Sequence, residues 1–219
     1  MFKRLMLLSL VTCVALTNTW ADAQVGQPDV HVGDLWKYHE LDGLTNETTN
    51  EFSHQIVEIN DHKITIQLKN KKMPGSALRY YNREWNPIDN GVVKYDPFYP
   101  EYKFPMNIGV TWKLDYRSTN TQRQSFSSVS NGKIVALEKV TVPAGTFDAY
   151  RIENDIETRD TGADANITKG HIITWYSPTA QKYIRRESTT FSGGRVRSNS
   201  IDELVEYSLE DNSGRVNDI

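Results

Sequence analysis

The sequence predicts an all-β protein: an antiparallel barrel, roll or sandwich of roughly ten strands. Apolar and polar residues alternate with period two over many short segments, and turn residues separate those segments. No stretch shows a helical apolar stripe flanked by capping residues. Together these observations favour strands that are joined by tight turns and pack around one core.

The segment 140–153 has the most clearly specified backbone geometry. Pro143 presets φ at the first central position of a tight turn, and Gly145 is able to adopt the positive φ that returns the chain antiparallel. We therefore predict a hairpin whose arms are 133–142 and 146–156.

Two further strand patterns lie before residue 70. Alternation predicts a strand that begins near Val30 and buries Trp36 and Tyr38. A hairpin is expected over 55–69, with its turn at Asn60-Asp61. Its inward set is expected to be Val57, Ile59, Ile64, Ile66 and Leu68. The polar run 44–53 fits either a loop or an edge strand.

The segment 70–105 is different in composition, because eight aromatic residues are interrupted by five prolines. Proline cannot donate to a sheet ladder, so a long central strand is excluded there. We expect an irregular excursion with one short strand near 92–95.

Strand patterns return after residue 109. We expect a strand over 110–117, an exposed strand within 118–130, a hairpin turn at Asn131-Gly132 and a polar loop over 159–169. Further strands are expected over 171–176, 182–191 and 195–209. The last strand is predicted to place Ile201, Glu203, Val205, Tyr207 and Leu209 on one side.

A weak internal echo connects the two halves of the chain. The run Gly33-Asp-Leu-Trp-Lys-Tyr38 is echoed by Gly109-Val-Thr-Trp-Lys-Leu114, and phenylalanine, asparagine and Lys-Ile follow in both at differing intervals. This suggests two related halves that share one core.

The amino terminus predicts export. Residues 1–23 contain Lys3 and Arg4, an apolar run, and a small-residue cleavage signal that ends at Ala23. The alternative is a lipoprotein acylated at Cys13, because the residues before it loosely resemble a lipobox. We predict a secretory signal peptide over 1–23, a single β-rich domain over 24–209 and a disordered tail over 210–219, with the mature protein periplasmic or secreted.

Cysteine and charge exclude several classes of function. Cys13 is the only cysteine, so a chain cleaved after Ala23 has no disulfide, zinc-thiolate site or cysteine nucleophile. The formal net charge is −3, without the basic face that a nucleic-acid partner requires. No later segment has the roughly 20 consecutive apolar residues of a transmembrane helix, so we expect no transmembrane anchor.

Five motifs, taken in order, resemble a known family. They are Gly33-x-x-Trp36-x-Tyr38, Phe104-Pro105-x-x-x-Gly109-x-x-Trp112, Val142-Pro-Ala-Gly-Thr-Phe147, Trp175-Tyr-Ser-Pro178 and Glu203-Leu-Val-Glu-Tyr207. Together they resemble the TapB-like exported β-domain families of unknown function in bacteria. The resemblance implies an antiparallel β fold and an envelope or secreted location, and it transfers no catalytic residue. One departure is Thr179-Ala180-Gln181, which stands where such proteins often have glycine.

The known catalytic and metal-binding motifs are absent, so we predict no catalytic residue, no metal and no cofactor. There is no Gly-x-Ser-x-Gly elbow, His-Glu-x-x-His pair or phosphate-binding glycine loop. The isolated residues His54, His62 and His171 are interpreted as exposed or hydrogen-bonded. The acidic loop with Asp155, Glu157, Asp160, Asp164 and Asn166 lacks the calcium-loop spacing, and we interpret it as a solvated turn.

The aromatic excursion is the one candidate binding site. Aromatic rings with polar tips can stack on sugars or hold acyl chains. The candidate residues are Trp85, Tyr95, Phe98, Tyr99 and Tyr102. They would line a barrel mouth or sheet edge, unless they are buried and plug the open end of the core.

The favoured hypothesis is a non-enzymatic exported domain that binds a lipid, a glycan or a protein partner of the envelope. The alternatives are a hydrolase of envelope polymers that uses a carboxylate pair assembled by the fold, and a structural or assembly domain.

Overall fold

The computed structural model describes residues 24–161 and 166–210. The predicted signal peptide, the alternative lipidation site at Cys13 and nearly all of the predicted tail lie outside the described residues, and they stay predictions. No helix able to span a membrane occurs in the described part of the chain.

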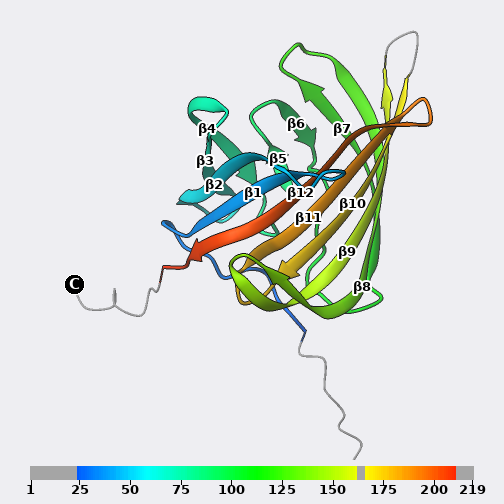
Figure 1. Cartoon of the computed structure of the whole chain (residues 1–219). Coiled ribbons are helices and arrows are strands. Elements are labelled where there is room, and N and C mark those ends of the chain that lie inside the picture. Colours follow the sequence, from blue (N-terminus) through cyan, green and yellow to red (C-terminus); the bar gives the residue numbers. More distant parts are fainter. Residues whose placement is uncertain (1–23, 162–165, 211–219) are drawn as a thin grey trace, which may run out of the picture.

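Twelve antiparallel strands close into a barrel (Figure 1). They are β1 (Leu35–Asp42), β2 (Thr48–Ile59), β3 (Ile64–Asn70), β4 (Met73–Tyr81), β5 (Pro87–Asp89), β6 (Val93–Asp96), β7 (Thr111–Asn120), β8 (Ser125–Val142), β9 (Gly145–Asp160), β10 (Ile167–Ser177), β11 (Lys182–Ser192) and β12 (Arg195–Ser208). Each strand pairs with its neighbours in sequence, and β1 pairs with β12 to close the barrel. The predicted fold class is therefore confirmed in its barrel form.

The strands that exceed the predicted ten lie in the proline-rich excursion. This segment contributes β4, β5 and β6, of which only β6 matches the short strand expected near 92–95. β5 has three residues and pairs with β6 through a single residue pair. The prolines thus permit strands here, but they keep this wall of the barrel short.

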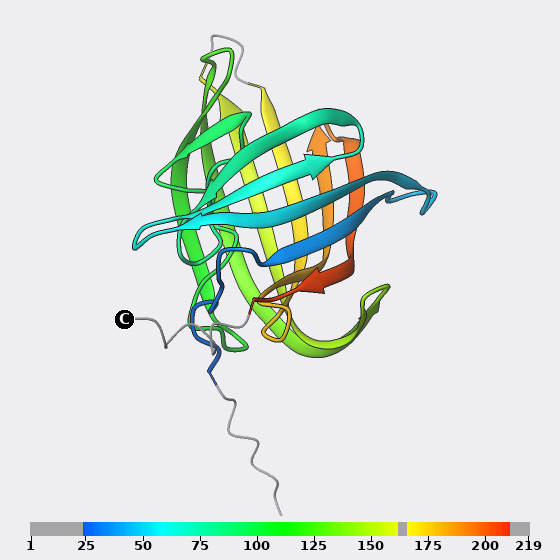
Figure 2. The ribbon, with the colours of Figure 1, turned by 90° about the vertical axis from the view of Figure 1, so that its left-hand side faces the viewer.

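The predicted hairpin of segment 140–153 is confirmed. β8 ends at Val142 and β9 begins at Gly145, whose φ is +134°. The hairpin curves across the lower end of the barrel (Figure 2), where the Ala144 amide donates a hydrogen bond of 3.0 Å to the Leu204 carbonyl. The lower end is therefore covered by the chain itself.

The predicted turn at Asn131-Gly132 is wrong, because β8 runs unbroken through both residues. A Cβ atom on Gly132 would lie 2.0 Å from Cε2 of Trp112, so the glycine makes room for that indole ring. The Trp112 indole in turn donates a hydrogen bond of 3.0 Å to the Pro100 carbonyl. Close packing, and not a turn, explains the glycine.

Two β-bulges change which residues face inward. A register shift between Ile56 and Glu58 leaves Val57 exposed, contrary to the prediction. A second shift, where Lys37 pairs with Glu206 and Tyr38 pairs with Leu204, changes the inward set of β12. The prediction that five alternate residues of this strand share one side is wrong, because the shift interrupts the alternation, and Asp202 lines the interior while Leu204 belongs to the core.

The two segments of the sequence echo share local geometry. Gly33 and Gly109 both have positive φ, and each precedes a strand. Their amides donate to the carbonyls of Ile56 and Ile134, at 2.9 and 2.8 Å. A register shift follows each isoleucine. The same entrance to a strand thus occurs twice, whereas the two related halves stay a prediction.

Core side chains fill the lower end of the barrel around the turn between β10 and β11, where the Trp36 indole donates a hydrogen bond to the Ala180 carbonyl. The side chains there that are almost fully buried include Trp36, Tyr38, Ile134, Ile152, Tyr176, Ile184 and Leu204. The turn between β10 and β11 closes over them with Gln181 at φ +56°, the left-handed conformation that glycine often supplies in such turns. The departure from the family pattern therefore leaves this turn tight.

Candidate ligand cavity

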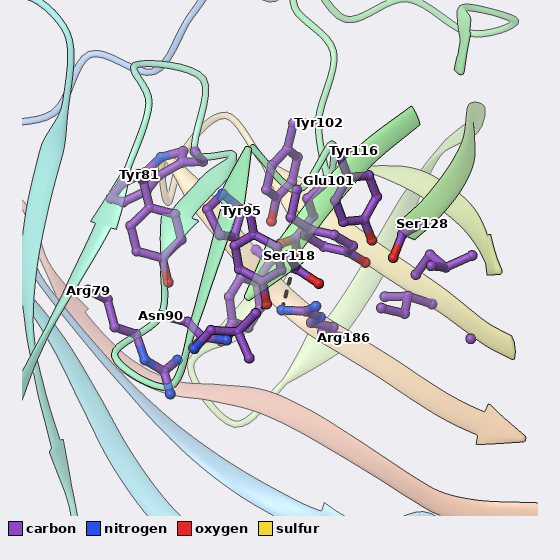
Figure 3. A pocket seen from close by; sticks show the side chains of 18 of the residues that line it. Arg79, Tyr81, Asn90, Tyr95, Glu101, Tyr102, Tyr116, Ser118, Ser128 and Arg186 are labelled. Carbon is purple, nitrogen blue, oxygen red and sulfur yellow. Dashed lines mark hydrogen bonds and ion pairs between the residues drawn. The ribbon is translucent and has the colours of Figure 1, made fainter. Parts of the chain in front are cut away.

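A cavity of about 500 Å³ lies inside the barrel. Half of its lining residues are aromatic or aliphatic. These lining residues are Phe52, Tyr81, Trp85, Pro87, Val93, Tyr95, Tyr99, Tyr102, Tyr116, Phe126, Ile156, Ile172 and Tyr183. Figure 3 shows the labelled tyrosines gathered around one space, together with Arg79, Glu101 and Arg186. The lower end of the cavity is buried, whereas lining residues near the upper turns, such as Thr158, Thr168 and Thr190, are half-buried.

Residues 97–110, which link β6 to β7, form part of the wall, and we call them the inner segment. Asn86 holds this segment twice: its Oδ1 accepts from the Tyr102 amide at 2.7 Å, and its Nδ2 donates to the Tyr102 carbonyl at 3.2 Å. Nδ2 of Asn154 donates to the Glu101 carbonyl at 3.1 Å. These bonds satisfy backbone groups that lie outside any sheet ladder, and they position the Glu101 side chain in the cavity.

A buried ion pair spans the cavity. Oε1 of Glu101 lies 3.3 Å from Nη1 of Arg186, which comes from β11 (Figure 3). Only 2% of Glu101 is exposed. Arg79, from β4, reaches the same space. Removing one member of such a pair would leave the other charge buried without compensation.

Asp202 lies beside this pair, because it is the register partner of Arg186. Burial raises the pKa of Asp202 to about 7, with smaller contributions from Glu40 and Glu101 in the same direction, while Arg186 and Arg79 oppose the shift. The carboxyl group is therefore near half protonation at neutral pH.

Lys182 occupies the deep end of the cavity inside a cage of three aromatic rings. Its Nζ lies 3.6 Å from the ring centroid of Trp85, 4.8 Å from that of Trp36 and 5.4 Å from that of Tyr81. Only 3% of the residue is exposed, and Nζ has no hydrogen-bond partner among the described residues. Burial lowers the pKa of Lys182 well below its ordinary value. The rings attract the charged form through cation–π contact, while burial disfavours it.

His54 contradicts its predicted environment. It is 2% exposed, and neither ring nitrogen has a hydrogen-bond partner among the described residues. Burial lowers the pKa of His54 well below its ordinary value, and the positive charges of Lys182, Arg79 and Arg186 lower it further. Three cationic side chains therefore act on one buried imidazole.

Four of the five candidate residues from the sequence line the cavity: Trp85, Tyr95, Tyr99 and Tyr102. Phe98 is half-buried and lies outside the cavity lining. Trp85, Tyr99 and Tyr102 are also buried, so they pack in the interior and line the cavity at once. Burial raises the pKa of Tyr95 to about 12, so its phenol is neutral at physiological pH.

The other candidate constellations are weaker. The described residues contain no group of three metal-ligating side chains. In the acidic loop, Asp155 contacts His171 at 2.8 Å and Glu157 pairs with Arg159 at 2.8 Å, which leaves little free carboxylate for calcium. Asp164 lies outside the described residues.

Comparisons with known proteins show what this chain resembles in sequence and in fold. Residues 99–189 match a protein-family profile described as DUF3108-like. The matched region contains Glu101, Lys182 and Arg186. It does not contain His54 or Asp202. A comparison with curated proteins finds no match.

Two solved structures share the fold at low sequence identity. One is a candidate lipoprotein from Parabacteroides distasonis, with 16% identity, a TM-score of 0.55, and coverage of 84% of this chain and 100% of that one. The other is a candidate exported protein with a YmcC-like fold from Bacteroides fragilis, with 14% identity, a TM-score of 0.52, and coverage of 84% and 99%. The likeness extends over nearly the whole of both proteins. The TapB-like assignment stays a prediction.

Proposed function

We propose that this protein is a non-enzymatic, exported binding protein that holds a small amphipathic molecule of the bacterial envelope inside its barrel. The observation that carries the proposal is the interior cavity of about 500 Å³, which lies within the range of roughly 300–1,000 Å³ typical of ligand sites. An apolar wall with a few convergent polar groups is the usual composition of such a site.

The composition of the cavity favours a lipid-like molecule over a glycan. Phe126, Ile156 and Ile172 offer aliphatic and aromatic surface without polar groups, which suits an acyl chain or another apolar body. The charged groups of the cavity include Glu101 and Asp202 beside Arg186, and Lys182 inside its aromatic cage.

Export is part of the proposal and rests on separate observations. The features of residues 1–23 predict a signal peptide, and the two similar structures belong to proteins described as a lipoprotein and an exported protein. Edman sequencing of protein from the periplasm tests the cleavage site. A mature chain that begins at Gln24 supports the proposal, and an acylated Cys13 replaces it with the lipoprotein alternative.

The first test is native mass spectrometry of mature protein purified from the periplasm without detergent, followed by solvent extraction. A bound small molecule at reproducible stoichiometry is expected. A bare polypeptide that also fails to bind envelope lipid extract would contradict the cavity proposal and would favour a protein partner.

A cavity-filling variant tests where the ligand binds. Thr168→Trp places an indole among the lining residues near the upper end, and we expect it to reduce bound ligand at least tenfold. Lys169→Trp is the matched control, because the neighbouring side chain of β10 is exposed on the outer face. Equal loss in both variants, or in neither, would place the ligand elsewhere.

A hydrolase that uses a carboxylate pair is the second candidate, because Glu101 and Asp202 line the same cavity in different environments. Such a pair can divide the acid and base roles of glycoside hydrolysis. Hydrolysis of envelope glycans by the wild type that is lost in Asp202→Asn would favour this candidate over a binding protein.

A further inference from the structure

The cavity wall contains buried hydrogen-bond donors that have no partner among the described residues. Nζ of Lys182, Nε of Arg79 and Nε of Arg186 are buried without a hydrogen-bond partner. A buried donor left unpaired is costly, so such groups in native proteins usually face a ligand or water. A molecule that brings acceptor oxygens would satisfy them.

The charges that line the cavity are also unbalanced. Glu101 is engaged by Arg186. Asp202 is near half protonation at neutral pH, because its pKa is about 7. Within the described residues, neither Arg79 nor Lys182 has an ion-pair partner within 4.0 Å, although both lie at the cavity. The excess is positive, which favours an anionic ligand.

One end of the cavity is more deeply buried than the other, and this difference indicates how a ligand would be oriented. Lys182 and its cage lie at the buried end, whereas Phe126 and Thr168 lie at the half-buried end near the upper turns. The apolar surface of Ile156 and Ile172 belongs to the same cavity. A charged group would therefore lie deep, with its apolar body extending toward the upper end.

On the premise of the proposed function, we propose that the ligand is an anionic amphiphile whose carboxylate or phosphate monoester binds between Lys182, Arg79 and Arg186. The guanidinium group of arginine can donate paired hydrogen bonds to the oxygens of a carboxylate or phosphate. Lys182 adds a positive charge that its aromatic cage holds in position. His54, beside these cations, contributes a neutral ring that is able to donate one further hydrogen bond.

The experiment compares four probes that share one apolar chain: dodecanoate, dodecyl phosphate, dodecanol and dodecylamine. Each displaces a fluorescent fatty acid from full-length mature protein at neutral pH. We expect at least one of the two anions to bind at least tenfold more tightly than dodecanol, and dodecylamine to bind most weakly. The tighter of the two anions identifies the headgroup as carboxylate or phosphate.

Variants then locate the headgroup. Lys182→Met and Arg79→Met keep most of the side-chain volume, and we expect each to weaken anion binding about tenfold while dodecanol binding is unchanged. Lys169→Met, on the outer face of β10, is the matched control and should bind as the wild type does. Circular dichroism establishes that each variant is folded, and the comparison of probes on the wild type does not depend on the variants.

The outcomes separate this inference from the function on which it rests. Equal affinity for dodecanoate, dodecyl phosphate and dodecanol would overturn the anionic site while leaving the cavity proposal intact. Displacement by none of the four probes, together with no ligand in the native mass spectrum, would overturn both. Unchanged anion binding in Lys182→Met and Arg79→Met would place the headgroup elsewhere.

Discussion

Asp202 shows how one buried group links stability to pH. Its folded-state pKa is about 7, above its ordinary value of 3.8, because burial favours the neutral acid. Between these two values the folded protein binds more protons at this site than the unfolded chain does. The contribution of Asp202 to stability therefore falls as pH rises toward 7. Above that pH the carboxylate is ionised inside the barrel, and the destabilisation stays constant.

We predict that Asp202→Asn stabilises the protein at pH 8 by on the order of 2 kcal/mol and has much less effect near pH 4.5. The amide is neutral at both values, whereas the carboxylate must ionise inside the barrel at pH 8. Urea denaturation of wild type and variant at each pH measures the difference between their free energies of unfolding. The titration of Lys182 and His54 affects both proteins and therefore cancels in this difference. An equal difference at both pH values would show that Asp202 does not titrate as described.

The structure shows that Trp85 is a core residue as well as a candidate binding residue. The sequence makes Trp85 a candidate binding residue, but this side chain is 2% exposed and its indole donates a hydrogen bond of 2.9 Å to the Gln181 carbonyl. Removing it would cost roughly 3–5 kcal/mol of stability. The charged residues of the cavity are therefore the better probes of binding.

At the scale of single elements, β8 shows how a side chain can determine the path of a strand. Gly132 and Trp112 are register partners on β8 and β7, and the indole ring covers the glycine. The same ring donates to Pro100 of the inner segment, so its position connects the barrel wall to the cavity lining.

We predict that Gly132→Ala destabilises the protein by about 2 kcal/mol, because the new Cβ would lie 2.0 Å from Cε2 of Trp112. The matched control is Gly170→Ala on β10, where the nearest atom to the new Cβ is Cδ1 of Ile156 at 3.4 Å. The shift in urea midpoint measures both changes. A similar midpoint for the two variants would contradict the packing explanation of Gly132.

At the scale of the whole molecule, the barrel wall is uneven. β8 and β9 form the longest ladder, whereas β5 pairs with β4 at two residues and with β6 at one. Local opening requires few ladder bonds to break where strands are short. The wall formed by β4, β5 and β6 is thus the expected place for the barrel to open and admit a ligand.

Hydrogen exchange tests this expectation. We predict that the strand amides of β5 and β6 exchange faster than those in the middle of β8 and β9, and that bound dodecanoate slows exchange in β5 and β6. Mass-spectrometric exchange on the full mature chain resolves these peptides. Uniform protection around the barrel would contradict a weak wall.

Much of the fold follows from local patterns in the sequence. Alternation identified most strands, and Pro143 with Gly145 determined the hairpin between β8 and β9, because both effects act within a few residues. The aromatic excursion was also recognisable, and four of its five candidate residues line the cavity. These features need no knowledge of what lies across the barrel.

The tertiary structure alone decided the rest. In the sequence alone Asn131-Gly132 predicts a turn, and only the structure shows Trp112 packed over Gly132. The bulge that places Asp202 on the inner face depends on the pairing of β12 with β1. Charged residues in a strand are ordinarily expected to face solvent. The sequence therefore did not indicate that Lys182, Arg186 and Asp202 share the interior of the barrel. Closure of twelve strands brings them around one cavity, because residues far apart in sequence become neighbours only when β12 pairs with β1.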